Sequence, residues 1–198
     1  MDKNERNILA AYHRANAAQK AEGLSWYYNV HLACCQFASK YNKSIEVVAG
    51  ITAALSPGLR WESNLEATRR ILANESLAGI GIRYTANIRK AYRILKATTP
   101  SGVSLEFHGR ERNKTRAFYT LLVNPSNPLT VCVDGHAFNI WHGQRIPIDK
   151  VPTLNRNRLY EKVSCAYINV ARQLNLLPNQ VQAITWLFWR HFDEVAPF

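Results

Sequence analysis

RERNKTRAFYTLLVNPSNPLTVCVDGHAFNIW, residues 110–141, contains two expected helices joined by an extended apolar segment. The first helix is predicted over 114–122, because its large apolar side chains recur at the spacing of one helix face. Asparagine and proline residues at 124–128 end it. Residues 129–133 are rich in β-branched side chains. A lone strand has no partner, so we expect a buried extended segment there instead.

The second helix is predicted over residues 135–142, with Asp134 as its N-cap. Hydrogen bonds from the helix amides keep such a carboxylate ionised. A fixed anion can stabilise a developing positive charge, such as the oxocarbenium form of a sugar. The simpler alternative is that Asp134 only caps the helix. His136 lies two positions further on, but Asp-x-His lacks a third ligand, so a structural histidine is favoured over a metal ligand.

Lys114 opens the first helix and is the candidate nucleophile. A lysine attacks carbon only in its neutral form, which burial beside Phe118 and Tyr119 at the positive end of a helix would favour. Such a lysine can form a Schiff base at a carbonyl carbon or a sugar C1′. The alternative is a solvated lysine at a helix start.

Helical patterns dominate the rest of the chain, which predicts an all-α fold. Ser44 can cap one helix, and residues 63–66, SNLE, are read as a capping box that starts the next. Residues 98–113 are expected to form a loop. We expect about nine helices in one compact domain over residues 1–198, either a single body or two helical lobes with the site between them. The expected helices outside 110–141 are 2–22, ended by Gly23, then 25–41, 44–57, 64–73, 83–97 with Tyr84 on its inner face, 158–175, and one that starts at Pro178.

Lysine and arginine outnumber aspartate and glutamate by 25 to 14, a net charge of +11. This balance is typical of proteins with a polyanionic partner, with nucleic acid first and a membrane surface second. In the middle of the chain, basic residues are interleaved with Trp61, Tyr84 and Phe107, a pattern that suits a protein that flips a base out of DNA. Charge on the outer faces of helices is the alternative. The basic residues of this region are Arg60, Arg69, Arg70, Arg83, Arg89, Lys90, Arg110, Arg112, Lys114 and Arg116.

The four cysteines show no zinc or iron–sulfur spacing, so we expect neither a metal nor a cofactor. They are expected to be small buried residues in a reducing compartment. The N-terminal segment lacks an apolar signal core, and no apolar run approaches about 20 residues. We therefore expect a soluble protein, cytoplasmic or nucleoid-associated, that does not enter a membrane. We also expect it to be a monomer. The cysteines are Cys34, Cys35, Cys132 and Cys165.

Several segments, in the same order, resemble the helix-hairpin-helix DNA glycosylase superfamily between about residues 44 and 192. Lys114-Thr115-Arg116-Ala117 matches the Lys-Thr-x-Ala that opens the second helix of the hairpin, where bifunctional members carry the catalytic lysine. Val133-Asp134-Gly135-His136 is similar to the Val-Asp-x-His that carries their catalytic aspartate. The other similar segments are 46–56, 61–72, 84–91 and 185–190.

The resemblance implies the fold and the activity of a DNA glycosylase, in a divergent, phage-type member from a bacterial or phage-infected cell. Asp134 would stabilise the sugar cation as the base departs, and Lys114 would attack C1′ to give the Schiff base of an AP lyase. The residues that would line the base pocket or act as a DNA wedge are Arg60, Trp61, His136 and Trp26. Contacts to the DNA backbone are expected from Arg110, Arg112, Arg116, Lys90 and Arg89.

The sequence departs from the superfamily in two loops. The Leu-Pro-Gly-x-Gly hairpin turn, whose amides hold a phosphate, is replaced by residues 107–113, FHGRERN. The glutamine that follows the early Leu-Ser is replaced by residues 57–61, PGLRW. Two alternatives therefore stand beside base excision. One is a transferase that attaches an amine or amino acid to modified thymine in phage DNA, and the other is a non-catalytic DNA-binding module.

Overall fold

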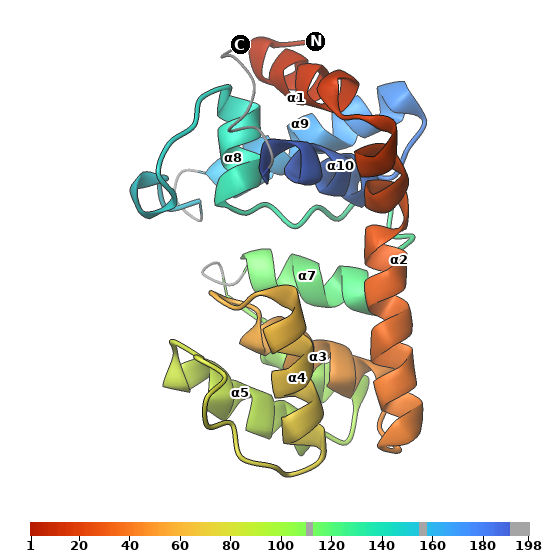
Figure 1. Ribbon diagram of the computed structural model, residues 1–198, viewed down its shortest axis with the longest axis vertical. Helices are drawn as coiled ribbons and strands as arrows, with labels where there is room; N and C mark the ends of the chain where they lie inside the picture. Colours follow the sequence, from red (N-terminus) through yellow and green to blue (C-terminus); the bar gives the residue numbers. More distant parts are fainter. Residues whose placement is uncertain (110–112, 155–157, 191–198) are drawn as a thin grey trace. The chain divides into compact units, whose positions relative to one another are not determined.

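The computed structural model describes residues 1–109, 113–154 and 158–190, and all the regular structure in these ranges is helical, which confirms the all-α prediction (Figure 1). The described ranges contain ten α-helices and one 3₁₀ helix, η2 (Ile148–Lys150). None of these helices is both long enough and apolar enough to cross a membrane. The α-helices are α1 (Lys3–Arg14), α2 (Ala17–Lys40), α3 (Ile45–Leu55), α4 (Trp61–Leu72), α5 (Thr85–Leu95), α6 (Pro100–Leu105), α7 (Asn113–Val123), α8 (Gly135–His142), α9 (Leu159–Leu174) and α10 (Pro178–Arg190).

The chain divides into two compact units. Unit 1 combines Met1–Tyr28 with the chain from Pro125 onward, and unit 2 is Asn29–Asn124. Helix α2 contributes its first half to unit 1 and its second half to unit 2. Each unit buries its own set of apolar side chains and so has its own core.

Unit 1 is built on α1, α8, α9 and α10, and each of these helices packs against the other three. Helix α9 follows the predicted pattern, because Val163, Tyr167 and Val170 recur at helical spacing and are fully buried. Helix α10 begins at Pro178, as predicted, and buries Ile184 completely. This packing fixes α8, which carries the candidate aspartate at its start.

Unit 2 is centred on α3, which contacts α4, α5, α6 and α7. Every side chain from Val47 to Leu55 is buried, as physical chemistry requires of a helix that is apolar on all sides. The predicted cap is confirmed, since the Ser44 hydroxyl accepts a hydrogen bond from the Val47 amide at 3.3 Å. Helices α5 and α7, which carry the basic candidate residues of this unit, are therefore both packed on one buried helix.

The prediction that Gly23 ends a helix is wrong, because α2 continues through this residue. A Cβ at position 23 would lie 2.7 Å from both the backbone nitrogen and the Cα of Ile184. The glycine therefore permits close packing of α2 on α10 instead of marking a helix end. The break between the first two helices falls at residues 15–16.

The capping box expected at residues 63–66 is not formed. Helix α4 begins at Trp61, and its N-cap residue, Arg60, makes no side-chain capping bond. Glu66 instead accepts hydrogen bonds from Arg69 and Arg70, and these bonds lower the pKa of Glu66 to about 2. Glu66 therefore forms ion pairs with Arg69 and Arg70 within α4 and does not mark the start of the helix.

The loop expected at 98–113 contains a helix, α6. The Thr99 hydroxyl caps it by accepting a hydrogen bond from the Gly102 amide at 3.1 Å, and Pro100 occupies its first turn. Two aromatic residues, one before this region and one within it, also differ from expectation. Tyr84 was predicted to face inward but is 53% exposed, and Phe107 was grouped with DNA-facing aromatics but is fully buried.

Candidate functional site

Asp134 lies in unit 1, where the extended segment meets α8. The Tyr160 hydroxyl holds this segment, since it donates to the Val131 carbonyl at 2.7 Å and accepts from the Val133 amide at 3.2 Å. Asp134 is half-buried, and its Oδ1 accepts a hydrogen bond from the Ala137 amide at 2.9 Å, which confirms the predicted N-cap. The carboxylate is therefore fixed at the positive end of α8.

Buried phenols lie near this carboxylate. Burial raises the pKa of Tyr27 well above its usual value, and the neighbouring Cys132 and Asp134 raise it further. Burial also raises the pKa of Tyr167, with a smaller contribution from Asp134. The Tyr27 hydroxyl donates to Oε1 of Gln182 at 2.8 Å. These phenols stay neutral, so around Asp134 they serve as hydrogen-bonding groups and not as bases.

Lys114 lies in unit 2, at the second residue of α7. The helix is present where the sequence predicted it, and Phe118 and Tyr119 are buried. Of the two alternatives for Lys114, the structure supports the solvated one, because its side chain is exposed and is not buried beside these rings. The apolar face of α7 turns Asn113 and Ala117 inward, which leaves the lysine on the outer face.

The two expected catalytic residues belong to different units: Lys114 to unit 2 and Asp134 to unit 1. Each is held at a helix start by the packing of its own unit. The roles of nucleophile and stabilising anion stay predictions.

The expected base-pocket residues are also distributed over both units. In unit 1, His136 is half-buried in the first turn of α8, and Trp26 is half-buried on α2, with its ring centroid 6.5 Å from that of Trp186. In unit 2, Arg60 is exposed and Trp61 is half-buried at the start of α4.

The expected DNA-backbone contacts fall into three groups. Arg110 and Arg112 lie outside the described residues. Arg116 is on the exposed face of α7, where its guanidinium donates to Oδ1 of Asn113 at 3.0 Å. Arg89 and Lys90 are on α5 and line the same pocket.

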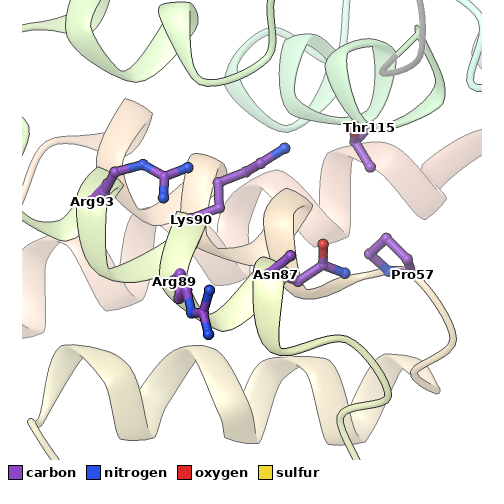
Figure 2. Close-up of a pocket in the computed structure, with 7 residues that line it drawn as sticks. Pro57, Asn87, Arg89, Lys90, Arg93 and Thr115 are labelled. Atoms are coloured by element: carbon purple, nitrogen blue, oxygen red, sulfur yellow. The ribbon is translucent and has the colours of Figure 1, made fainter.

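This basic pocket has a volume of about 470 Å³ and lies entirely within unit 2 (Figure 2). Helix α5 supplies most of it, because positions 86, 89, 90 and 93 recur at helical spacing on one face. None of the described residues that line it is acidic. In Figure 2 the Lys90 ammonium extends toward Thr115 of α7, and the Asn87 amide extends toward Pro57. The lining residues are Pro57, Ala86, Asn87, Arg89, Lys90, Arg93 and Thr115.

Two of the cations are held in place by neighbouring residues. The Arg93 guanidinium donates to both carboxylate oxygens of Glu106, each at 2.8 Å, and this raises the pKa of Arg93. The Lys90 ammonium lies 5.3 Å from the ring centre of Phe107, which stacks on Tyr119 at 4.9 Å. A fork of hydrogen bonds and a cation–π contact thus orient positive charge toward the pocket.

Sequence reasoning selected Arg89 and Lys90 but missed Arg93, Asn87 and Thr115. The spacing of Ala86, Arg89, Lys90 and Arg93 along one helix face was the available signal for Arg93. Thr115 joins the pocket only through the packing of α7, which no local pattern reveals. No group of three or more histidine, cysteine, aspartate or glutamate side chains in the described part of the chain is placed to hold a metal ion.

Residues 1–193 match the model of a protein family described as "Family of unknown function (DUF7178)", and the chain therefore belongs to this family. No curated protein and no solved structure matches the chain.

Proposed function

We propose that this DUF7178 family member binds DNA and removes a base from it by breaking the N-glycosidic bond. The observation that carries the proposal is the basic pocket of unit 2, where Arg89, Lys90 and Arg93 line one cavity. Phosphate contacts from lysine and arginine supply most of the sequence-independent affinity of proteins for nucleic acids. The net charge of +11 adds long-range attraction for a polyanion.

The chemistry is assigned to Asp134. Its carboxylate is fixed because it accepts a hydrogen bond from the Ala137 amide of α8, and the Tyr160 hydroxyl holds the preceding segment through the Val131 carbonyl. A fixed anion of this kind stabilises the positive charge that develops on the sugar as the base leaves. Tyr27 and Tyr167 stay neutral because burial raises the pKa of both phenols, so the negative charge of this site belongs to Asp134. The resemblance of residues 133–136 to the Val-Asp-x-His segment of DNA glycosylases supports the same assignment.

Excision assays test this assignment. Oligonucleotides that contain uracil, an oxidised base, an alkylated base or a hypermodified base are incubated with the protein and scored with and without alkali. Asp134→Asn keeps a capping side chain, so the fold is retained while the charge is lost. We expect this change to slow excision about 10²- to 10³-fold, the usual effect of removing one preorganised electrostatic group. Asp149→Asn is the matched control, because Asp149 is an exposed aspartate of unit 1.

Lys114 is proposed as the Schiff-base nucleophile of an accompanying lyase step. After the base has left, the amine adds to the aldehyde carbon C1′ of the abasic sugar and water is lost, which gives an imine. Borohydride reduces this imine to an amine and so links the protein to DNA covalently. We expect Lys114→Ala to abolish this trapping and Lys96→Ala, another exposed lysine of unit 2, to leave it intact. Trapping that persists in Lys114→Ala would place the nucleophile elsewhere.

One outcome would overturn the role of Asp134, and two others would overturn base excision itself. Full activity of Asp134→Asn on every cleaved substrate would remove the carboxylate from the mechanism. Addition of an amine to modified phage DNA, detected by mass spectrometry of nucleosides, would favour the transferase. Salt-sensitive binding of DNA that is left chemically unchanged would favour a binding module. For each phosphate contact on duplex DNA, log K should then fall by about 0.9 when the salt concentration rises tenfold.

A further inference from the structure

The basic pocket differs from a flat basic surface in having space for more than a phosphate group. Its volume of about 470 Å³ is in the range of small-ligand sites. A phosphate group alone leaves most of this space unused. A nucleotide, with a sugar and a base attached to the phosphate, uses it.

The charge of the pocket matches a terminal phosphate better than an internal one. Arg89, Lys90 and Arg93 supply three positive charges, and the Glu106 carboxylate bound to Arg93 offsets one of them. The remaining charge of these four side chains is +2. A phosphate monoester carries about −1.5 to −2 at neutral pH, whereas each internal phosphate of a nucleic acid carries a single negative charge.

The uncharged lining residues suit the rest of a nucleotide. The Asn87 amide both donates and accepts hydrogen bonds, and base edges present donors and acceptors together. The Thr115 hydroxyl can donate to a phosphate or sugar oxygen. Pro57 and Ala86 offer apolar surface to the face of a sugar or base.

Two of the three cations, Lys90 and Arg93, are ordered before any ligand arrives. Glu106 fixes the Arg93 guanidinium through two hydrogen bonds, and Phe107, stacked on Tyr119, lies beneath the Lys90 ammonium. Preorganised side chains lose less conformational entropy when they bind, which favours a defined site over diffuse attraction. We therefore propose that the basic pocket binds a single nucleotide through its terminal phosphate, either at the 5′ end of a DNA strand or as a free nucleoside monophosphate. The DNA-end form of this inference rests on the proposed DNA binding.

The test compares the affinities of the full chain for two single-stranded oligonucleotides that differ only in a 5′-phosphate. We expect the phosphorylated strand to bind about tenfold more tightly, as a charge-assisted contact should provide. Lys90→Gln should remove this preference, whereas Lys96→Gln, an exposed lysine at the end of the same helix and outside the pocket lining, should keep it. Equal affinities for the two strands, or a preference that survives Lys90→Gln in a folded protein, would overturn the strand-end form.

A second measurement separates the two sources of the ligand and the role of the nucleoside. Free nucleoside monophosphate and inorganic phosphate are titrated into the protein, and binding is followed by calorimetry. Asn87→Ala should weaken nucleotide binding and leave phosphate binding unchanged, because it removes no charge. Binding of free nucleotide without binding of DNA would support the nucleotide site in the basic pocket and refute the proposed function. DNA binding that does not depend on a terminal phosphate, in a protein that does not bind free nucleotide, would refute the nucleotide site and leave the proposed function standing.

Discussion

Tyr160→Phe tests whether the segment before Asp134 is held by a single hydroxyl. The substitution keeps the buried ring and removes two hydrogen bonds, to the Val131 carbonyl at 2.7 Å and from the Val133 amide at 3.2 Å. Leaving a buried backbone group unsatisfied costs about 1–3 kcal/mol, so two such groups would cost up to about 6 kcal/mol. The Val133 amide also donates to the Val131 carbonyl at 3.2 Å, and this turn bond remains in the variant. We therefore expect a loss near the low end, about 2 kcal/mol.

Urea unfolding followed by circular dichroism measures this loss, together with a fall in Tm of about 4–8 °C. Tyr28→Phe is the control, because Tyr28 is 56% exposed and the same atom is removed. We expect the control to change the free energy of unfolding by less than about 0.5 kcal/mol. If Tyr160→Phe is as stable as the control, the hydroxyl does not hold the segment, and the account of how Asp134 is positioned fails.

Three other predictions concern stability and reactivity. Gly23→Ala should destabilise unit 1 by about 1–2 kcal/mol in urea unfolding, because overpacking against the α10 backbone exceeds the gain in helix propensity. Unchanged or increased stability would contradict the close packing of α2 on α10 at this glycine. Glu66→Gln should lower Tm at neutral pH. The difference in Tm between the native protein and the variant should persist above the pKa of Glu66 in the unfolded chain, about 4.3. It should vanish as pH falls through the pKa of Glu66 in the folded protein, about 2. A difference in Tm that remains below this pH would indicate that Glu66 stabilises the fold by packing and not by charge. In the native protein, iodoacetamide should label exposed Cys165, seen by peptide mass spectrometry, and spare Cys34, whose pKa burial raises to about 12; labelling of both at equal rates would contradict this burial.

Local signals predicted the helices whose ends carry capping chemistry. Ser44 and Asp134 each start a helix through a side-chain oxygen, and both caps are present. Thr99 followed by Pro100 carried the same kind of signal for α6, and the prediction of a loop overlooked it. Capping depends on residues within one turn, so the sequence alone contains the needed information.

Predictions that depended on tertiary packing were less successful. Gly23 was expected to end a helix, but the backbone of α10 requires a glycine there. The sequence left open whether Lys114 is buried beside Phe118 or solvated, and the packing of α7 on α3 decides it by leaving the lysine on the exposed face. In the same way, Tyr160 is 27 residues from the amide it binds, and its position in the chain gives no sign of this role.

The division into units allows binding and chemistry to be tested separately. The basic pocket belongs to unit 2, and Asp134 belongs to unit 1, so substitutions at the two places alter groups held by different cores. Lys90→Gln should raise the Kd for DNA and leave the single-turnover excision rate at saturation unchanged, because phosphate contacts are equal in the ground and transition states. Asp134→Asn should lower that rate and leave Kd unchanged, because its interaction forms as charge develops on the sugar. A rise in Kd together with a fall in rate in either variant would show that one group serves both steps, and the separate assignments to the two units would have to be abandoned.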